Sequence, residues 1–406
     1  MKRIHIALVT QLGNGHVYPV LPLCAELLRR GYYVTFITSA HYSRCIMDIG
    51  ATPVIINYNP PDNELVQSLR SISHLKCDDV ELWRLFRSLQ SYQLEFSTSV
   101  VAQVHRFYEA NPPNLILYDP YAVAGRLLAH RLNCRAVRVS PHFAQYGTNL
   151  IRDGGVCKTP LASMDFRADL DSFLRSQGIE TENNLYYIED LNIHLIPRAF
   201  QYCESHFDSR FCFAGALLDR KFTPAWKDAS DGRPIVLISD FSGLRDSFMS
   251  SGYLYTPLVE ALSGEGFHCI LSVSDDTDLH LTRPLPRHFE INRRASHLEI
   301  LPNVSLLICH GGMLSTLEAL YNGVPVLAIP NYIGAEEVAF RVEELGVGRR
   351  LRRSDLAIEV IGEAVREMVG DRSLHERVRQ MQSSFRQSGG VHLAVDRIEQ
   401  EAGRST

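Results

Sequence analysis

The stretch from Leu306 to Ile329, LLICHGGMLSTLEALYNGVPVLAI, decides the fold. Leu306–Cys309 is a short apolar run of the kind that forms a buried parallel strand. After a turn at His310–Met313, Ser315–Tyr321 has apolar residues at helical spacing, and Val324–Ile329 reads as the next strand. The stretch therefore predicts a strand, a turn, a helix and a second strand, which is the repeating unit of a parallel sheet.

The turn of this unit is suited to an anion. Gly311 and Gly312 let the backbone approach a ligand closely. The amides from Gly312 to Ser315 point out of the predicted helix N-terminus, where negative charge is favoured. Glu318 lies one turn further on and can accept hydrogen bonds from sugar hydroxyls. A diphosphate with a ribose attached fits this arrangement, and the alternative is an ordinary βαβ turn with a buried His310.

The spacing of four residues in this unit, His310, Gly312, Ser315 and Glu318, resembles the donor-binding signature of GT-B nucleotide-sugar glycosyltransferases. HGGMLSTLEALYNGVPVLAIP, followed by FRVEELGVG, is similar to the bacterial macrolide and natural-product type. The resemblance implies an α/β GT-B fold of two Rossmann-like domains, with parallel sheets and a cleft between them. It also implies that His310 and the turn amides, including those of Gly312, Met313 and Ser315, bind the diphosphate, and that Glu318 binds the ribose.

The composition limits which kinds of protein this chain can be. The 406 residues suggest two or three domains, and 45% apolar content is enough for sizeable cores. A net charge of -5 gives no electrostatic reason to expect nucleic acid as a partner. The nine scattered cysteines contain no CxxC pair, which favours reduced thiols in the cytoplasm over a zinc site or a disulfide framework. The apolar run Ile4–Val9 reads as too short and too polar for a signal peptide, and we expect no membrane-spanning stretch.

The first half of the chain alternates strands and helices. Ile4–Thr10 reads as a buried strand, Val20–Arg30 as a helix and Tyr32–Thr38 as a second strand. This alternation predicts a parallel sheet with helices on both faces. Gly13-Asn14-Gly15 is followed by Tyr18 where a dinucleotide fingerprint needs a third glycine, so that fingerprint is incomplete. Residues 141–165 read as a loop that faces the acceptor.

A polar segment with Pro224 inside it divides the two halves. We expect residues 1–218 to form an N-terminal acceptor-binding domain and residues 219–233 to be the linker. Residues 234–390 would then form the donor-binding domain. In GT-B enzymes the final helix crosses back onto the N-terminal domain, and the resemblance assigns that helix to residues 391–406.

Two residues of the first half have the chemistry of a base and its orienting partner. His16 lies in the loop after the first strand, before a helix that we expect to begin near Pro19, and Asp119 follows a later strand. Both positions fall at the carboxyl edge of a parallel sheet, where ligands bind. An acceptor hydroxyl needs a base of near-neutral pKa, and a carboxylate can fix the tautomer of that base. The alternative is a capping histidine and an unrelated aspartate at a strand end.

The resemblance supports the functional interpretation of this pair. The family has a catalytic histidine in the first βα loop and an aspartate after a later strand, and His16 and Asp119 match these positions. Asn14 in the same loop and Phe143 in the 141–165 segment are assigned to acceptor binding. Direct attack at the anomeric carbon would invert its configuration.

Departures from the family pattern gather on the sugar side of the donor. Relatives carry Trp-x-Pro-Gln where this chain has Arg294-Ala295-Ser296-His297, and they carry an acidic residue and a glutamine where it has Gly334 and Ala335. Ser242 lies where relatives have a glycine-serine turn near the leaving diphosphate. The donor-binding positions therefore also include Ser242, Arg294, Ala295, Gly334 and Ala335. The loss of polar partners favours a donor sugar that is deoxygenated, otherwise modified or bound differently, and the alternative is a protein that has lost transfer activity.

The sequence as a whole predicts an inverting, metal-independent glycosyltransferase. It would move a sugar from a UDP or dTDP donor to a hydroxyl of a small natural product, such as a macrolide or polyketide, with no cofactor besides the nucleotide sugar. Asp276-Thr277-Asp278 resembles a metal-binding DxD motif of another fold, but a solvated turn fits its polar loop better. Two rivals remain, a GT-B sugar-nucleotide epimerase and a non-catalytic nucleotide-sugar-binding protein. We expect a monomer or a homodimer.

Overall fold

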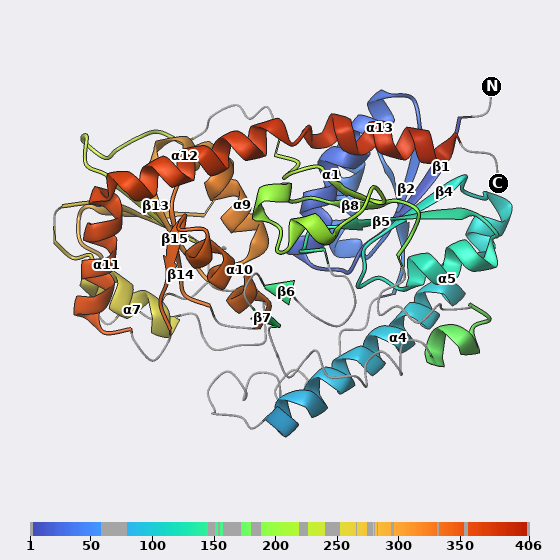
Figure 1. The fold of residues 1–406 in the computed structure, drawn as a ribbon, viewed down its shortest axis with the longest axis horizontal. Coiled ribbons are helices and arrows are strands. Elements are labelled where there is room, and N and C mark those ends of the chain that lie inside the picture. The colour runs from blue at the N-terminus through green and yellow to red at the C-terminus, as the bar shows by residue number, and fades with distance from the viewer. Residues whose placement is uncertain are drawn as a thin grey trace. The chain divides into compact units, whose positions relative to one another are not determined.

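The computed structural model divides into two compact α/β units (Figure 1). Unit 1 comprises Met1–Ser68, Lys76–Asp219 and Gln387–Thr406, and unit 2 comprises Leu69–Leu75 and Arg220–Arg386. The structure describes residues 3–57, 79–144, 151–152, 155–156, 172–179, 188–218, 226–239, 252–264, 266–273, 279, 281, 283–293, 296–330, 333–352 and 356–403.

Unit 1 is built on a seven-stranded sheet in the order β3-β2-β1-β4-β5-β8-β9, with every pair of neighbours parallel. The strand order reverses between β1 and β4, and such a reversal opens a crevice at the carboxyl edge of the sheet. The strands are β1 (His5–Val9), β2 (Tyr33–Thr38), β3 (Thr52–Ile55), β4 (Leu115–Tyr118), β5 (Arg135–Ser140), β8 (Asn192–His194) and β9 (Phe211–Phe213).

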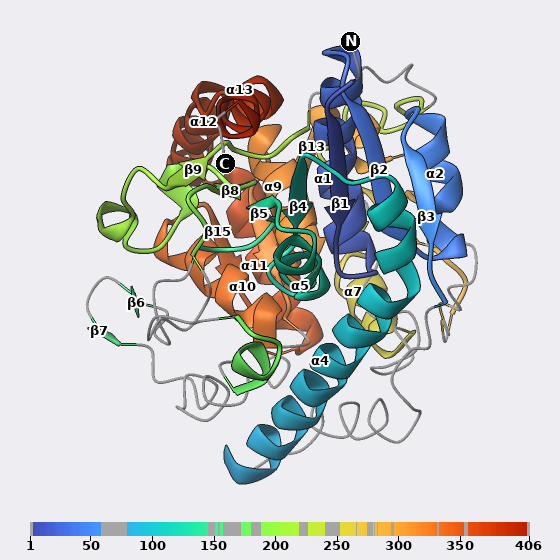
Figure 2. The same cartoon turned by 90° about the vertical axis from the view of Figure 1, so that its right-hand side faces the viewer.

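Alternate residues of β1 build two cores, one on each face of this sheet. Ile6 and Leu8 are buried in a core shared with α1 (Asn14–Arg29) and α13 (Gly390–Ala402). Ala7 and Val9 are buried on the opposite face with α4 (Asp79–Ala110) and α5 (Ala124–Arg131). Because both faces are covered, the strands are nearly continuous in apolar residues, as the sequence indicated. The N-terminal half of α4 reaches beyond the sheet (Figure 2).

Helix α1 begins earlier than the sequence predicted. Its first residue is Asn14, and the carbonyl of Gly13 accepts hydrogen bonds from the amides of His16 at 3.0 Å and Val17 at 2.9 Å. The expected start near Pro19 is therefore wrong, because two prolines, Pro19 and Pro22, lie inside this helix. A proline there removes one hydrogen bond of the helix and crowds the preceding turn. His16 thus lies in the first turn of α1 instead of in the preceding loop.

Unit 2 is built on a six-stranded parallel sheet in the order β12-β11-β10-β13-β14-β15. The predicted strand–turn–helix–strand unit is confirmed as β13, α9 and β14, and Leu306–Cys309 is fully buried within β13. The strands are β10 (Ile235–Ser239), β11 (His268–Ser272), β12 (Phe289–Asn292), β13 (Val304–Cys309), β14 (Val326–Ala328) and β15 (Gly348–Arg350). The longer helices are α7 (Gly252–Ala261), α9 (Met313–Tyr321), α10 (Ile333–Glu344), α11 (Ile358–Gly370) and α12 (Arg372–Gln387).

Short strands are where sequence and structure differ most. β8 was not predicted because it has only three residues, and two of them, Asn192 and His194, are polar yet fully buried. The side-chain amide of Asn192 donates to the carbonyl of Glu189 at 2.7 Å, which compensates for its burial. Within the segment 141–165, predicted as a loop, Ile151–Arg152 (β6) and Gly155–Val156 (β7) pair as antiparallel strands.

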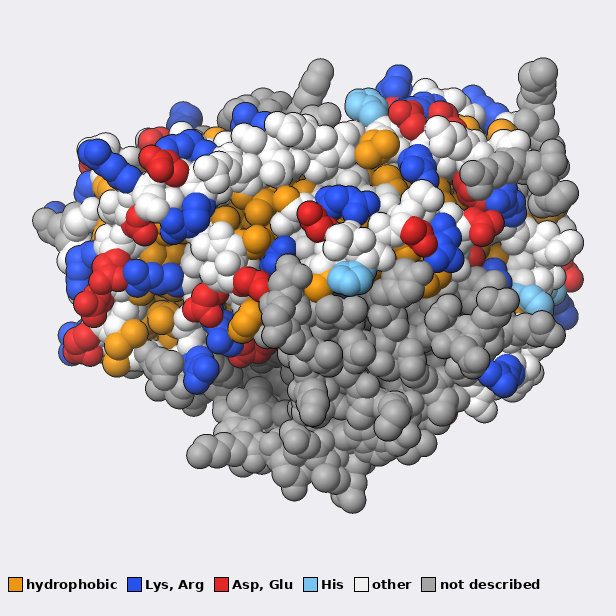
Figure 3. Space-filling model, viewed as in Figure 1, with side chains coloured by type: hydrophobic (Ala, Val, Ile, Leu, Met, Phe, Trp, Pro, Cys, Tyr) orange, Lys and Arg blue, Asp and Glu red, His pale blue; other side chains and the backbone are white. Residues whose placement is uncertain are grey.

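The surface agrees with a weakly charged protein. On the face shown in Figure 3, Lys and Arg side chains are interspersed with Asp and Glu side chains across the described surface. Among the residues that the structure describes, no helix is long and apolar enough to cross a membrane.

Candidate active site

His16 and Asp119 meet at the carboxyl edge of the unit 1 sheet. His16 is the third residue of α1, and Asp119 directly follows β4, which pairs with β1. Nδ1 of His16 lies 2.6 Å from Oδ2 of Asp119. The Asp119 side chain is fully buried, while the His16 side chain is 15% exposed. The buried carboxylate therefore holds an imidazole that can still be reached from outside.

The carboxylate of Asp119 is itself held in place. Its Oδ1 accepts a hydrogen bond from the amide of Tyr121 at 2.8 Å, and its backbone carbonyl accepts from the amide of Ala122 at 2.8 Å. Because a carboxylate only accepts hydrogen bonds, Nδ1 of His16 carries the proton in this pair and Nε2 is the basic nitrogen. The arrangement can take a proton at Nε2 and stabilise the resulting imidazolium.

Two further rings surround His16, and sequence reasoning missed both. The ring of His142 lies 4.9 Å from that of His16, and the ring of Tyr121 lies 5.7 Å from it, edge to face. Burial lowers the pKa of His142 from 6.5 to about 3; His16 adds to this effect and Asp119 opposes it. His142 is therefore neutral at neutral pH and leaves His16 free to accept a proton. The signal for His142 was its position just after β5, at the same sheet edge.

The two residues assigned to the acceptor occupy different surroundings. Asn14 opens α1, and its side-chain oxygen accepts a hydrogen bond from the Tyr42 hydroxyl at 3.0 Å. Phe143 is buried in unit 1, where its ring stacks on Phe200 at 5.6 Å and packs against Tyr202 at 4.9 Å. Asn14 thus shares the helical turn of His16, whereas Phe143 belongs to an aromatic core.

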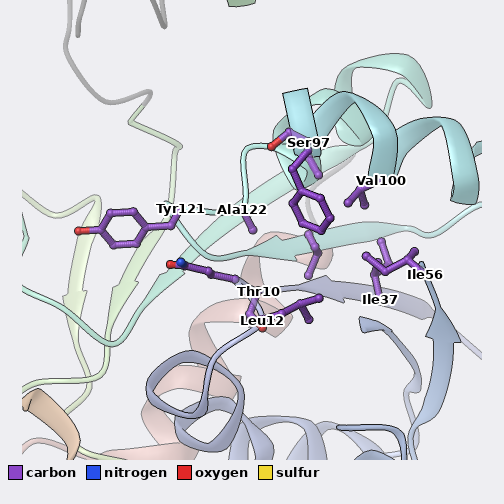
Figure 4. Close-up of a pocket in the computed structure, with 12 residues that line it drawn as sticks. Thr10, Leu12, Ile37, Ile56, Ser97, Val100, Tyr121 and Ala122 are labelled. Atoms are coloured by element: carbon purple, nitrogen blue, oxygen red, sulfur yellow. The ribbon is translucent and has the colours of Figure 1, made fainter. Parts of the chain in front are cut away.

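A cavity of about 40 Å³ lies beside Tyr121 at the same sheet edge (Figure 4). Its walls come from the end of β1, the loop after β4, and α4, and they include Val9, Thr10, Phe96 and Val100. Tyr121 is one of the lining residues, and its ring also lies 5.7 Å from that of His16.

In unit 2 the N-terminus of α9 is open. Gly312 is the N-cap residue, with no side-chain cap, and its carbonyl accepts from the amide of Thr316 at 3.1 Å. The amides of Met313, Leu314 and Ser315 precede that bond, and they are the first-turn N–H groups that a helix leaves for an anion. The N-terminus of α9 thus presents first-turn amides, which favour an anion.

Contacts within the turn explain why glycine occupies positions 311 and 312, and these contacts could not be read from the sequence. Gly311 has φ of +78°, and a Cβ there would lie 3.0 Å from the carbonyl oxygen of Ala335. A Cβ at Gly312 would lie 2.5 Å from Nε2 of His310, so the imidazole packs directly over this glycine. The glycines thus make room for protein groups in the turn, and Gly312 sets the position of the His310 ring.

Glu318 lies on α9 beside a histidine of the preceding helix, α8 (His297–Ile300). Nδ1 of His297 is 3.6 Å from Oε2 of Glu318, and Nε2 is 3.2 Å from Oγ of Ser272. Only 13% of the Glu318 side chain is exposed. The carboxylate assigned to a ribose therefore has a basic neighbour, which sequence spacing did not indicate.

The start of α10 holds the positions that depart from the family pattern. Gly334 is exposed, and Ala335 is fully buried. Glu336, which follows them, has its Oε2 3.0 Å from Nη1 of Arg350 on β15. Ser242, Arg294 and Ala295, and the Asp276–Asp278 motif, lie outside the described residues. In the described part of the chain, no group of three or more His, Cys, Asp and Glu side chains is arranged to hold a metal ion.

Comparison with known proteins identifies the family. Residues 265–388 match a family model described as Erythromycin biosynthesis protein CIII-like, C-terminal domain. The chain is 34% identical to the NDP-glycosyltransferase YjiC of Bacillus licheniformis, with 98% of each protein covered. It shares 28% identity and a TM-score of 0.81 with the crystal structure of CalG4, the calicheamicin glycosyltransferase, over the full length of both chains.

A spinosyn rhamnosyltransferase, SpnG, solved in complex with thymidine diphosphate, has the same fold. It is 19% identical, with a TM-score of 0.74, over 98% of this chain and all of that one. The extent of the match with YjiC and CalG4, together with the two parallel sheets, settles the classification. The protein belongs to the GT-B NDP-glycosyltransferases of the macrolide and natural-product type.

Proposed function

We propose that this enzyme transfers a sugar from a UDP or dTDP donor to a hydroxyl of a small, largely apolar natural product, with inversion and without a metal ion. The observation that carries the proposal is the 2.6 Å contact between His16 Nδ1 and Asp119 Oδ2, because it pairs an accessible base with a buried orienting carboxylate. Unit 1 would then bind the acceptor and unit 2 the donor, with residues 219–233 as the linker.

In the proposed reaction Nε2 of His16 removes the proton from the acceptor hydroxyl. The hydroxyl oxygen attacks the anomeric carbon from the face opposite the diphosphate, and the bond from that carbon to the diphosphate oxygen breaks. This displacement inverts the anomeric configuration. Asp119 stabilises the imidazolium formed on His16. Asn14 and Phe143 are proposed to bind or shape the acceptor site, Asn14 directly and Phe143 from within its aromatic core.

The leaving diphosphate needs charge stabilisation, and the N-terminus of α9 supplies it in our proposal. The amides of Met313, Leu314 and Ser315, together with His310, would bind the diphosphate oxygens. Glu318 would accept hydrogen bonds from the ribose. Ser242, Arg294 and Ala295 keep their proposed donor-binding roles. The spinosyn rhamnosyltransferase of the same fold was solved with thymidine diphosphate bound, which agrees with a dTDP donor.

The donor sugar is proposed to be deoxygenated or modified. Gly334 and Ala335 offer no side-chain polar atom, and Ala335 is buried. Glu336 and Glu337 are the candidate replacements for the missing carboxylate. The carboxylate of Glu336 already pairs with Arg350 at 3.0 Å, and the side chain of Glu343 also approaches Arg350 at 3.5 Å. A fully hydroxylated hexose would therefore find fewer partners here. Competition between UDP-glucose and dTDP-deoxysugars for one acceptor, compared by kcat/KM, tests this, and a clear preference for UDP-glucose would refute it.

The test of the proposed mechanism is His16→Ala. Loss of the base should lower kcat by about 10²–10⁴-fold while the affinity for UDP or dTDP stays unchanged, because the nucleotide is bound by unit 2. Asp119→Asn should cost less, since Asp119 orients the base and never accepts the acceptor's proton. His105→Ala, on α4, is the matched control and should keep wild-type turnover. If His16→Ala keeps near wild-type turnover, His16 is not the base. If the wild type consumes donor in the absence of an acceptor, the reaction is hydrolysis or epimerisation instead of transfer.

A further inference from the structure

The imidazole of His16 is held at one of its nitrogens, and a ring can swing about a single hydrogen bond. Oδ2 of Asp119 lies 2.6 Å from Nδ1 of His16. The ring of His142 lies 4.9 Å from that of His16 and is tilted by 53° to it, and this packing limits the swing. Burial lowers the pKa of His142 to about 3, so the contact places no charge beside the base. The position of His142 therefore bears on where Nε2 of His16 points.

The backbone that carries His142 is fixed by two polar side chains. Oγ of Ser140, the last residue of β5, accepts a hydrogen bond from the amide of His142 at 3.2 Å. Nδ1 of His194, on β8, donates to the carbonyl of His142 at 3.0 Å. The His194 ring is fully buried and stacks on those of Phe211 and Phe213, at 5.9 Å and 5.5 Å. A rigid donor in the core of unit 1 thus holds His142.

Gln201 fixes the same segment two residues further on. Its side-chain oxygen accepts from the amide of Ala144 at 2.7 Å, and its side-chain nitrogen donates to the carbonyl of Ala144 at 3.0 Å. The same nitrogen donates to the carbonyl of Tyr202 at 2.9 Å. Because both backbone groups of Ala144 are bonded to a buried amide, the segment cannot slide without leaving buried polar groups unpaired, which is costly.

We propose that His194 and Gln201 are positioning residues for sugar transfer, which act through His142 to fix the orientation of the His16 ring. Neither can touch a substrate, because His194 is 0% and Gln201 1% exposed. A base must be aimed closely at the proton that it removes, and a displacement of about 1 Å can lower a rate about 10²-fold. The inference rests on the proposed function, since it takes Nε2 of His16 as the base.

The experiment removes each of these contacts with a substitution of similar shape. Gln201→Met loses the bonds made by the amide. His194→Phe keeps a ring that can stack but loses the donor to the carbonyl of His142. His142→Ala removes the ring that packs on His16, whereas His142→Phe keeps an aromatic ring without its nitrogens.

The matched control is Tyr108→Phe. The hydroxyl of Tyr108 is also buried and paired in unit 1, 3.0 Å from Oγ1 of Thr35. The Tyr108 ring stacks on that of His5, the first residue of β1, and so lies at the edge of the sheet opposite to His16. Its loss should lower the melting temperature, as should Gln201→Met, without changing the site.

Two quantities are measured for each variant. The first is kcat for transfer from UDP-glucose or a dTDP sugar to naphthol and a panel of other hydroxylated aromatic acceptors. The second needs no substrate: it is the rate at which the proton between His16 and Asp119 exchanges with water, followed by NMR. The absence of this proton's signal in His16→Ala identifies it.

We expect His142→Ala, His194→Phe and Gln201→Met each to lower kcat by about tenfold or more and to speed the proton exchange. The affinity for UDP should not change, because unit 2 binds the nucleotide in our proposal. His142→Phe should recover most of the kcat that His142→Ala loses, and Tyr108→Phe should leave both quantities at wild-type values. In a His142→Ala background, Gln201→Met should cost no further kcat, because both substitutions act on one contact.

The inference is overturned if His194→Phe and Gln201→Met keep wild-type kcat and proton exchange, or if Gln201→Met lowers kcat equally with and without His142. It is also overturned if the proton of wild-type His16 exchanges too fast to be seen, since the ring would then not be held. If the wild type transfers no sugar to any acceptor while the exchange depends on His194 and Gln201, the proposed function fails and the positioning of His16 stands.

Discussion

At the scale of single residues, Gly312 positions the ring on which donor binding depends in our proposal. A side chain at this position would place its Cβ 2.5 Å from Nε2 of His310. Gly312→Ala should therefore displace the imidazole and weaken UDP or dTDP binding by about tenfold, as for one lost charge-assisted hydrogen bond. Calorimetric titration with the free nucleotide measures this.

The control for Gly312→Ala is Gly370→Ala in the same unit. A Cβ at Gly370 would meet nothing within 4 Å, so nucleotide affinity should stay at the wild-type value. Equal affinities in Gly312→Ala and the wild type would show that His310 can move without loss, and would remove the ring from the donor site.

Residues that follow strands at the carboxyl edge of a sheet can be placed together from the sequence. Contacts between side chains of separate loops and helices are harder to predict. His16 and Asp119 could be placed together because each follows a strand at the carboxyl edge of one parallel sheet. His142 and His297 could not be identified as the partners of His16 and Glu318, because their contacts depend on how separate loops and helices pack. Sequence spacing indicates which helix, strand or loop a residue belongs to, but not which side chains of other elements it contacts.

At the scale of elements, the N-terminus of α9 replaces a metal ion in the proposed reaction. Its first-turn amides offer positive charge to the diphosphate without a cation. We therefore expect transfer to continue at its full rate in excess EDTA. Turnover measured before and after chelation, and again after adding Mn²⁺, checks this. Activity that disappears with EDTA and returns with Mn²⁺ would overturn the metal-independent mechanism. Asp276 and Asp278 would then become candidate metal ligands.

Helix α13 completes the core of unit 1. Val395 and Ile398 are fully buried in the core that α1 shares with the sheet. Ile398→Ala should lower the free energy of unfolding by about 2–5 kcal/mol, since it removes buried methylenes and leaves a cavity. Ile358→Ala on α11, where the isoleucine is 38% exposed, should change it by less than about 0.5 kcal/mol. Urea unfolding compares the two, and equal losses would show that α13 is not part of this core.

Elements with a strong local signal were predicted well, and those set by tertiary packing were not. The predicted strands Ile4–Thr10 and Tyr32–Thr38 differ from β1 and β2 by at most one residue at either end, because apolar runs between turn residues define them. β8 gave no such signal, since its buried Asn192 and His194 depend on partners elsewhere in the fold. The start of α1 was predicted wrongly, because proline is common in the first turn of a helix and Pro19 therefore suggested a start there. In the structure α1 begins at Asn14, with Gly13 as the N-cap residue.

At the scale of the whole molecule, buried ionisable groups make the stability depend on pH. Burial lowers the pKa of His142 and of His194 from 6.5 to about 3, so both stay neutral in the folded protein. The unfolded chain takes up these protons as the pH falls below 6.5, and stability falls with it. Glu189 acts in the opposite direction, because burial raises its pKa from 4.5 to about 7 although Arg126 and the Tyr118 hydroxyl oppose the shift.

The effect of Glu189 can be isolated with Glu189→Gln. The acid is favoured in its neutral form when folded, so its contribution is fully present below pH 4.5 and is lost as the pH rises to about 7. Glutamine cannot ionise, and the hydroxyl of Tyr118, now 2.8 Å from Glu189 Oε1, can still donate to its oxygen. Relative to the wild type, the variant should therefore gain about 2–3 kcal/mol of unfolding free energy between pH 5 and pH 8. Urea unfolding of both proteins at the two pH values measures this difference, in which the common contribution of His142 and His194 cancels. Parallel pH dependences would mean that Glu189 is ionised in the folded state throughout, held by Arg126 and its other basic neighbour, Arg138.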